Sequence, residues 1–164
     1  MQEKQGPMQE WELAARESIR DLIARYNANG DTGRFDEVIE LFAPDAVMDV
    51  GGQRYEGRDA IRTIFTSAAQ RVRADAGERR DHGGAARPHL RHFTATHQID
   101  VTSATTATSR CYFQVLMPHG LDHWGRYLDD FGVVDGRWRF TSRHVITDGA
   151  TPGGFATGQG LSST

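Results

Sequence analysis

Two histidines stand five residues apart in the segment RHFTATHQIDV, residues 91–101. Its threonine, aromatic and branched aliphatic residues are typical of a β-strand, in which successive side chains point to opposite faces. The imidazole of histidine has an ordinary pKa of about 6.5, so it can accept and release a proton near neutral pH. Because an odd number of positions separates His92 from His97, regular alternation places them on opposite faces. We therefore expect only one of them to face a pocket and act as a proton carrier.

Regular alternation conflicts with the burial expected in two strands. It puts His97 on the same face as Ile99, which should be buried, so either both faces of the sheet are covered or a β-bulge shifts the register. In the last strand the same conflict separates Arg143 from Phe140. A bulge near residues 141–142 would bring them onto one face.

A histidine base needs a carboxylate to orient it, and Asp31 is the candidate. It lies in the segment NANGDTGRF, residues 27–35, which joins two predicted helices. A carboxylate at such a junction can point away from the solvated face of a helix. The alternative is a helix N-cap, in which Asp31 accepts hydrogen bonds from the free N–H groups of the second helix. The residues alone leave both interpretations open.

Other residue pairs carry weaker signals. His119 and His123 have a spacing that can bind metal, but a turn is a poor place for a closed site and no third ligand is indicated, so we expect no metal and no cofactor. Asp129 and Asp130 are adjacent in a predicted strand, so they point to opposite faces and cannot act together.

Composition and charge restrict the class of protein. The chain has 164 residues, with 19 basic and 22 acidic side chains, and its net charge of −3 does not suggest a nucleic-acid partner. Its single cysteine, Cys111, excludes an intramolecular disulfide and favours a reducing compartment. No stretch approaches the roughly 20 apolar residues of a membrane span, and residues 1–10 lack the apolar core of a signal peptide. We expect a cytoplasmic protein with no membrane partner.

Hydrophobic periodicity predicts helices in the first half of the chain. Three segments place apolar residues on one face at helical spacing. They are residues 11–30, closed by Gly30, residues 35–42, ended by Pro44, and a segment beginning near Gly57. Residues 73–91 are rich in Arg, Gly and Ala, which predicts a surface loop that is either a lid over a pocket or a linker.

The second half of the chain is predicted to be β-structure. After a short strand at 46–50, four long strands follow at 91–101, 107–117, 122–134 and 137–148. Asp135-Gly136 between the last two is a strong hairpin signal, and four consecutive strands make an antiparallel meander. Helices on one face of such a sheet give an α+β fold, and a strongly curved sheet would enclose a pocket beneath them.

The domain organisation is simple. Residues 10–149 are predicted to form one domain, between a flexible lead-in at 1–9 and a flexible Gly/Ser/Thr-rich tail at 150–164. When helices cover only one face of a sheet of long strands, the apolar side chains on the other face stay uncovered. We therefore expect the outer face of the sheet to pair with another subunit in a homo-oligomer, either a dimer or a trimer.

Four segments resemble the SnoaL-like branch of the nuclear transport factor two-like superfamily. They cover most of residues 15–148: ESIRDLIARYNANGDTGRFDEVIELFAPDAVMDV, YEGRDAIRTIF, RHFTATHQIDV and GRYLDDFGVVDGRWRFTSRHVITD. The pattern is similar in particular to the hexachlorocyclohexane dehydrochlorinase and scytalone dehydratase enzymes of that superfamily. The resemblance implies a cystatin-like α+β barrel, in which a cone-shaped, curved mixed sheet is wrapped by three N-terminal helices around a central pocket.

The resemblance also implies roles for individual residues. It places Asp31 and His92 on the catalytic pair of the dehydrochlorinase, Arg143 on a pocket arginine and Tyr127 in the pocket wall. Tyr26 stands where that enzyme has a pocket lysine, so a different substrate is expected, and Tyr26 either donates a hydrogen bond in the pocket or packs in the core. Two further aromatic residues could join a wall that suits a flat or hydrophobic substrate. These are Trp124 and Phe113.

These observations predict a cofactor-free lyase or isomerase. His92 would abstract a proton, Asp31 would orient it and Arg143 would bind negative charge, on a small hydrophobic, aromatic, polyketide-like or terpenoid-like substrate. Dehydration and dehydrohalogenation are the eliminations that fit this chemistry. The alternatives are a ketosteroid-type isomerase or cyclase, and a non-catalytic small-molecule-binding or assembly domain of the same fold.

Overall fold

A computed structural model of the chain describes residues 6–81 and 89–157, with only the backbone described for residues 75–81. Three helices and six strands follow one another along the chain. They are α1 (Glu10–Thr32), α2 (Phe35–Ile39), β1 (Phe42–Val50), β2 (Gln53–Glu56), α3 (Gly57–Asp81), β3 (Arg91–Val101), β4 (Thr106–Met117), β5 (Gly120–Val134) and β6 (Arg137–Ala150). The four long strands agree with the sequence pattern to within a few residues. β2 is a strand that the pattern does not predict.

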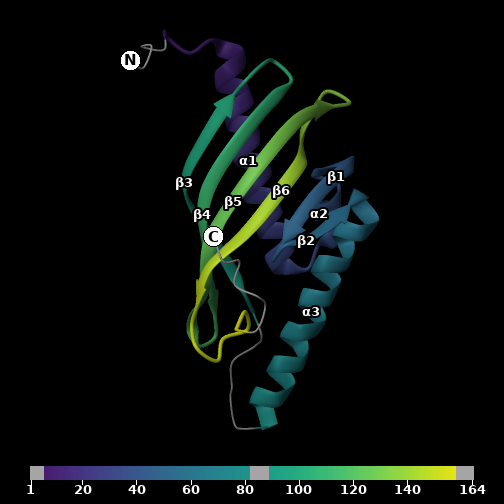
Figure 1. The fold of residues 1–164 in the computed structure, drawn as a ribbon, viewed down its shortest axis with the longest axis vertical. Coiled ribbons are helices and arrows are strands. Elements are labelled where there is room, and N and C mark those ends of the chain that lie inside the picture. Colours follow the sequence, from purple (N-terminus) through teal and green to yellow (C-terminus); the bar gives the residue numbers. More distant parts are fainter. Residues whose placement is uncertain (1–5, 82–88, 158–164) are drawn as a thin grey trace.

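The strands form a single mixed sheet in the order β2-β1-β6-β5-β4-β3. β3 to β6 are the predicted antiparallel meander, and β1 adds to β6 in parallel. Figure 1 shows the long, twisted strands lying side by side. The α+β class with a curved mixed sheet is confirmed, but the barrel is wrong: among the described residues β2 and β3 each pair on one side only, so the sheet stays open.

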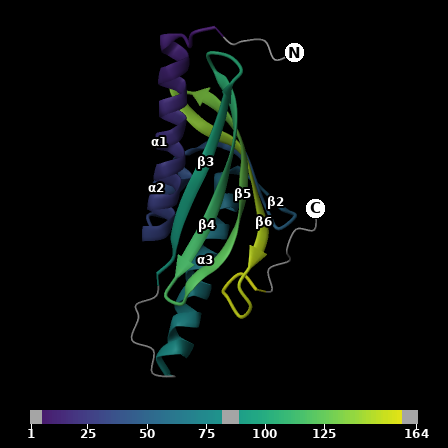
Figure 2. The ribbon, with the colours of Figure 1, turned by 90° about the vertical axis from the view of Figure 1, so that its left-hand side faces the viewer.

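Helix α1 packs lengthwise on one face of the sheet, as the side view shows (Figure 2). Its buried face carries the apolar residues that predict it, including Ile19, Leu22, Ile23 and Tyr26. These side chains meet inward-facing residues of β1, β3, β5 and β6 in the main hydrophobic core. Helix α1 covers only part of the inner face of the sheet. Helix α3 and the segment after β6 cover one end of that face.

The end of α1 differs from the prediction, and the difference places a candidate residue. The helix passes through Gly30 and ends at Thr32, because Gly33 adopts the left-handed conformation with φ 77°. The N–H of Gly33 then donates to the carbonyl of Gly30 and the N–H of Arg34 to that of Asn29, which is the Schellman arrangement. Asp31 consequently lies in the last turn of α1 and not in a loop between helices.

Helix α3 corrects the prediction of a loop at residues 73–91. It continues to Asp81, because this run of Arg, Ala, Asp and Glu contains no proline and only one glycine, Gly77. Residues 82–88 of the predicted loop lie outside the described residues, as do residues 1–5 of the lead-in and 158–164 of the tail. Figure 1 shows α3 running past the end of the sheet. The predicted second helix is also shorter than expected, because Phe42 already belongs to β1.

Two bulges resolve the conflicts in strand alternation. In β3 the pairing with β4 shifts between Ala95 and Gln98, and Thr96 has a positive φ of 56°. In β6 the pairing with β5 shifts at Thr141, within the segment where the sequence suggested a bulge. Each extra residue moves the following side chains to the other face. The β3 bulge therefore brings His97 onto the inner face, and the expectation that it points to the outer face is wrong.

The outer face of the sheet carries exposed apolar side chains. Four of them lie on neighbouring strands: Phe93, Tyr112, Trp124 and Leu128. This is the face that the sequence analysis expects to pair with another subunit, and the homo-oligomer stays a prediction. None of the helices in the described part of the chain is long and apolar enough to cross a membrane.

Candidate active site

A cavity of about 380 Å³ lies between the inner face of the sheet and the helices. This is within the size range of small-molecule sites, although near its lower end. Its walls come from the last turns of α1, from α3, from strands β1 and β3 to β6, and from the segment after β6. Most of them are apolar, and the lining includes Met48, Ile64, Phe65, Val72, Leu90, Val145, Phe155 and Ala156. Such a site fits a small, largely hydrophobic ligand that is oriented by a few polar groups.

Asp31 and His92 meet at the wall of this cavity. One carboxylate oxygen of Asp31, Oδ1, lies 2.6 Å from Nδ1 of the His92 ring, and the other, Oδ2, accepts the backbone N–H of His92 at 2.9 Å. The Asp31 side chain is only 7% exposed, so these bonds are shielded from water. Both carboxylate oxygens are therefore committed to one residue of β3, and the N-cap interpretation of Asp31 is wrong.

This geometry determines how the imidazole can act. The carboxylate of Asp31 accepts a hydrogen bond from Nδ1–H of His92, which leaves Nε2 of the neutral ring with a free lone pair. A proton taken up at Nε2 would create an imidazolium beside a carboxylate and near the C-terminal end of α1, where the helix dipole favours positive charge. The pair therefore has the arrangement that a general base requires.

His97 occupies a different environment although it shares the inner face. Its Nε2 lies 3.0 Å from Oγ1 of Thr94, within the same strand, and the residue does not line the cavity. Burial lowers the pKa of His97. No acidic partner is hydrogen-bonded to it among the described residues, and its Nδ1 has no hydrogen-bond partner there either. His97 is thus placed as a neutral packing residue under α1.

Arg143 does not line the cavity, contrary to its predicted role as a substrate-binding residue. Its side chain is fully buried and forms two hydrogen bonds to Asp129: Nε to Oδ1 at 2.7 Å and Nη2 to Oδ2 at 2.8 Å. The guanidinium lies 4.0 Å from the ring centre of Tyr26 and 4.2 Å from that of Tyr127. These rings stand between Arg143 and the cavity, so Arg143 supports the wall and does not reach a substrate directly.

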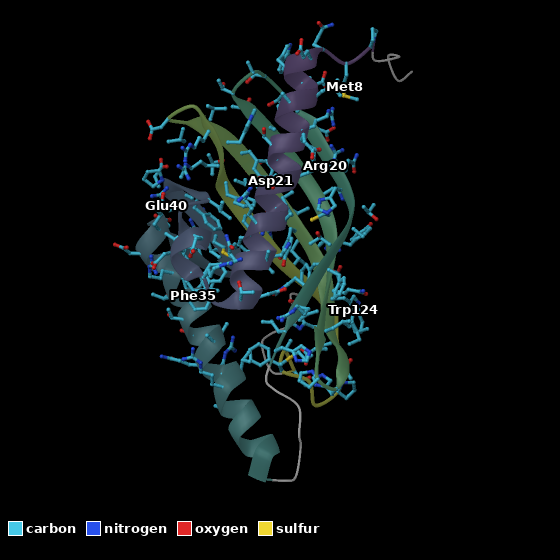
Figure 3. The ribbon with its side chains drawn as sticks, turned by 180° about the vertical axis from the view of Figure 1, so that it is seen from behind. Met8, Arg20, Asp21, Phe35, Glu40 and Trp124 are labelled. Carbon is cyan, nitrogen blue, oxygen red and sulfur yellow. The ribbon has the colours of Figure 1, made fainter. Side chains whose placement is uncertain are left out.

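Three of the four aromatic candidates line the cavity. Tyr26, Phe113 and Tyr127 contribute to it, and the rings of Phe113 and Tyr127 are stacked with centres 4.6 Å apart. Burial raises the pKa of both tyrosines, so their phenols stay protonated. Trp124 is the exception: it is on the outer face (Figure 3), where its ring lies over Gly149. Three positions separate it from Tyr127, and strand alternation sends the two to opposite faces.

Two groups of cavity residues are missing from the predictions. His123 lines the cavity beside a buried aspartate, Asp122, and Phe155 and Ala156 line it from the predicted flexible tail. His123 has the same strand parity as Tyr127, and that signal alone could have pointed to it. No comparable signal marks the tail, because the hydrogen bonds from the N–H groups of Phe155 and Ala156 to Asp122 join residues more than 30 positions apart.

Within the described part of the chain, no group of three or more His, Cys, Asp and Glu side chains is placed to hold a metal ion. His119 and His123, which have metal-like spacing, both bond to Asp122, at 3.1 Å and 2.7 Å. In this arrangement the carboxylate is already surrounded by hydrogen-bond donors. The two imidazoles are thus used to hold the turn between β4 and β5.

We expect activity to survive removal of metal ions. The protein would be incubated with excess EDTA, desalted into metal-free buffer and compared with untreated protein in the same turnover assay. Because the arrangement of Asp31 and His92 can provide a base without a Lewis acid, the rates should agree within about twofold. A stoichiometric metal in the purified protein, together with loss of the rate on its removal and recovery on its return, would contradict this prediction.

Comparisons with known proteins agree with this architecture. A family model described as a SnoaL-like domain matches residues 11–144. Among solved structures, the chain is similar to a putative scytalone dehydratase from Novosphingobium aromaticivorans DSM 12444, with 21% identity over 88% of this chain and 91% of that one and a TM-score of 0.69. It is also similar to a hexachlorocyclohexane dehydrochlorinase, LinA-type3, from Novosphingobium barchaimii LL02, with 16% identity over 86% and 91% of the two chains and a TM-score of 0.68.

A third similar structure is that of a protein of unknown function from Mycobacterium tuberculosis. It shares 24% identity over 87% of this chain and 80% of that one, with a TM-score of 0.68. No curated protein sequence matches the chain. At these identities the solved structures establish the fold, and the chemistry must be argued from the residues of this chain.

Proposed function

This chain belongs to the SnoaL-like domain family, and from that membership and the geometry of its cavity we propose that it is a cofactor-free lyase or isomerase in which His92 removes a proton from a small hydrophobic substrate. Asp31 orients His92 and stabilises the imidazolium that forms. The observation that carries this proposal is the contact between Asp31 and the Nδ1 atom of His92 at the cavity wall, 2.6 Å long and shielded from water.

The reaction requires a carbon acid. Nε2 of His92 takes a proton from carbon, the electron pair of the C–H bond forms a double bond, and a leaving group departs from the neighbouring carbon or a carbonyl becomes an enolate. The first outcome is an elimination and the second leads to an isomer. A dehydratase and a dehydrochlorinase are named among the proteins of similar fold, which supports elimination as the first reaction to test.

The walls of the cavity limit the substrate to a small, flat or compact molecule. The stacked Phe113 and Tyr127 rings form one apolar surface, and apolar side chains of α3 line the cavity as well. The charge of Arg143 is held behind the tyrosine rings, and the guanidinium of Arg71 on α3 packs over the Phe155 ring, 4.9 Å from its centre. A hydrophobic ring compound is therefore the preferred substrate class.

Proton abstraction can be tested before the natural substrate is known. A panel of small cyclic ketones and β-hydroxyketones, such as 2-tetralone, would be incubated with the protein in D₂O and followed by NMR for exchange at the acidic carbon and for loss of water. We expect exchange above the buffer rate, and a slower rate for Asp31→Asn, whose amide can no longer stabilise the imidazolium. A matched control is Asp36→Asn, which changes an exposed carboxylate on α2, away from the cavity lining.

The same experiment separates the proposed enzyme from a binding domain. If panel members bind, as judged by shifts of protein resonances, but exchange no faster with the protein than with buffer, the protein is a binder and the catalytic proposal is wrong. If exchange is fast and Asp31→Asn leaves it unchanged, the base is not the Asp31–His92 pair.

A further inference from the structure

His123 and Asp122 form a second histidine–aspartate pair at the same cavity. Nδ1 of His123 lies 2.7 Å from Oδ2 of Asp122, in the same arrangement as His92 with Asp31. Asp122 is completely buried, and His123 lines the cavity. The bulge at Asp122, where the pairing of β4 with β5 shifts, allows two adjacent residues to be buried in one strand. The proposed reaction makes no use of this pair.

The two imidazoles lie on the inner surface of the sheet, two strands apart. His92 of β3 pairs with Val115 of β4, and Val115 pairs with His123 of β5, so the three residues form a row across neighbouring strands. Two strand spacings correspond to about 10 Å between the backbones of the histidines. The Phe113 ring lies between them, with its centre 6.3 Å from that of His92 and 5.9 Å from that of His123. One ring of a ligand lying on this surface can reach both.

The surroundings of Asp122 determine which nitrogen of His123 carries the proton. Burial acts to raise the pKa of Asp122, but hydrogen bonds from His123 and from the backbone N–H groups of Phe155 and Ala156 lower it overall, so the carboxylate is ionised. An ionised carboxylate only accepts hydrogen bonds, and Nδ1 of His123 must therefore donate.

The His123 ring is neutral near pH 7. Burial lowers its pKa, the bond to Asp122 opposes this shift, and the nearby His92 lowers the pKa further. A neutral ring protonated on Nδ1 has an unprotonated Nε2, which can only accept a hydrogen bond. A bound ligand would cover Nε2 of His123. The ligand must then donate a hydrogen bond to this nitrogen, because an unpaired buried polar atom costs free energy.

We propose that His123 selects hydroxylated substrates, by accepting a hydrogen bond at Nε2 from a hydroxyl group on a flat ring whose acidic carbon faces His92. This inference rests on the proposed function and specifies its substrate class as hydroxylated ring compounds, in preference to halogenated or unsubstituted hydrocarbons. His123 touches the substrate in this arrangement, and Asp122 is a positioning residue that acts through it.

Matched probes test the proposal without turnover. Binding of 2-naphthol and of naphthalene would be measured by NMR titration in the His92→Phe background, where His123 is the remaining histidine of the two pairs. Replacing His123 by Phe in that background keeps an aromatic ring and removes the acceptor. We expect the affinity ratio of 2-naphthol to naphthalene to fall roughly tenfold, as for loss of one hydrogen bond that leaves a buried hydroxyl unpaired. His123→Gln, whose side-chain carbonyl can accept, should restore part of the ratio.

A second measurement needs no substitution at His123. In ¹⁵N-histidine-labelled protein, Nε2 of His123 should show the chemical shift of an unprotonated nitrogen, and 2-naphthol, but not naphthalene, should move it toward the hydrogen-bonded value. The proposal is overturned by an unchanged affinity ratio in the His123→Phe protein, by a protonated Nε2 at pH 7, or by no binding of 2-naphthol up to its solubility. These readouts do not depend on proton abstraction, so they can fail while the exchange experiment succeeds, and the reverse.

Discussion

Replacing His92 by Ala should lower the rate of proton abstraction at least about a hundredfold while the fold is retained. The substitution removes the nitrogen that accepts the proton, and a positioned general base contributes on the order of 10²–10⁴ in rate. The side chain is 21% exposed and its neighbours include the open cavity, so truncation leaves no large closed void. The measurement is the initial rate on a substrate found in the ketone panel, with circular dichroism and the melting temperature recorded for each variant.

The matched control is His97→Ala, five residues along the same strand and on the same inner face. His97 is bonded to Thr94 and does not line the cavity, so its replacement should change the rate by no more than about twofold, even if the melting temperature falls. A near-normal rate for His92→Ala, or a large loss for His97→Ala with the fold intact, would show that the base has been assigned to the wrong residue.

Replacing Asp129 by Ala should destabilise the protein by roughly 3–5 kcal/mol. Arg143 is fully buried, and its two hydrogen bonds to a side chain both go to Asp129. Removing the carboxylate leaves a buried guanidinium without its counter-charge, which is among the largest single-residue effects known in proteins. The free energy of unfolding would be obtained from urea denaturation followed by fluorescence and by circular dichroism.

The adjacent residue provides a close control for this prediction. Asp130 is exposed on the opposite face of β5, so Asp130→Ala should change the free energy of unfolding by about 0.5 kcal/mol or less. The double variant Asp129→Ala with Arg143→Met should regain much of the lost stability, because it removes the unpaired charge as well. If the Asp129 and Asp130 substitutions lowered the free energy of unfolding equally, breaking the Arg143–Asp129 pair would not have the predicted destabilising effect.

The Arg143–Asp129 pair also bears on the cavity. The guanidinium packs on the rings of Tyr26 and Tyr127, both of which line the cavity wall. An aromatic ring over a buried cation gains attraction that fixes its position. Arg143 therefore influences the shape of the site through the two tyrosines, although no part of it lines the cavity. The resemblance implied that Arg143 binds substrate, whereas its contacts indicate a supporting role behind the wall of the cavity.

Periodicity determined most of the fold from the sequence alone. The face formed by Ile19, Leu22, Ile23 and Tyr26 predicts α1. Alternation agrees with β4 along its whole length and with β5 from Tyr127 to Phe131, where buried and exposed side chains follow each other. The same alternation separates Asp129 from Asp130, as the structure shows. These patterns are local: each depends only on which side of a helix or strand must leave water.

The ends of elements were harder to predict, because several residues can end a helix. From the sequence, either Gly30 or Gly33 could end the helix. Only the hydrogen bonds donated by the N–H groups of Gly33 and Arg34 show that Gly33 does. That choice puts Asp31 in the last turn of α1, facing β3 across a sequence distance of 61 residues. The sequence and its resemblance could name Asp31 and His92 as candidates, but their meeting depends on how α1 lies on the sheet.

The positions of His97 and Arg143 were decided by tertiary structure. A bulge inserts one residue and reverses the facing of every side chain that follows in the strand, and the pairing of neighbouring strands determines where the insertion lies. In β3 the bulge brings His97 inward, and in β6 it puts Arg143 on the inner face with Phe140. Sequence patterns report which residues prefer burial. Only the paired strands determine which buried residues share a cavity, because that depends on contacts between distant parts of the chain.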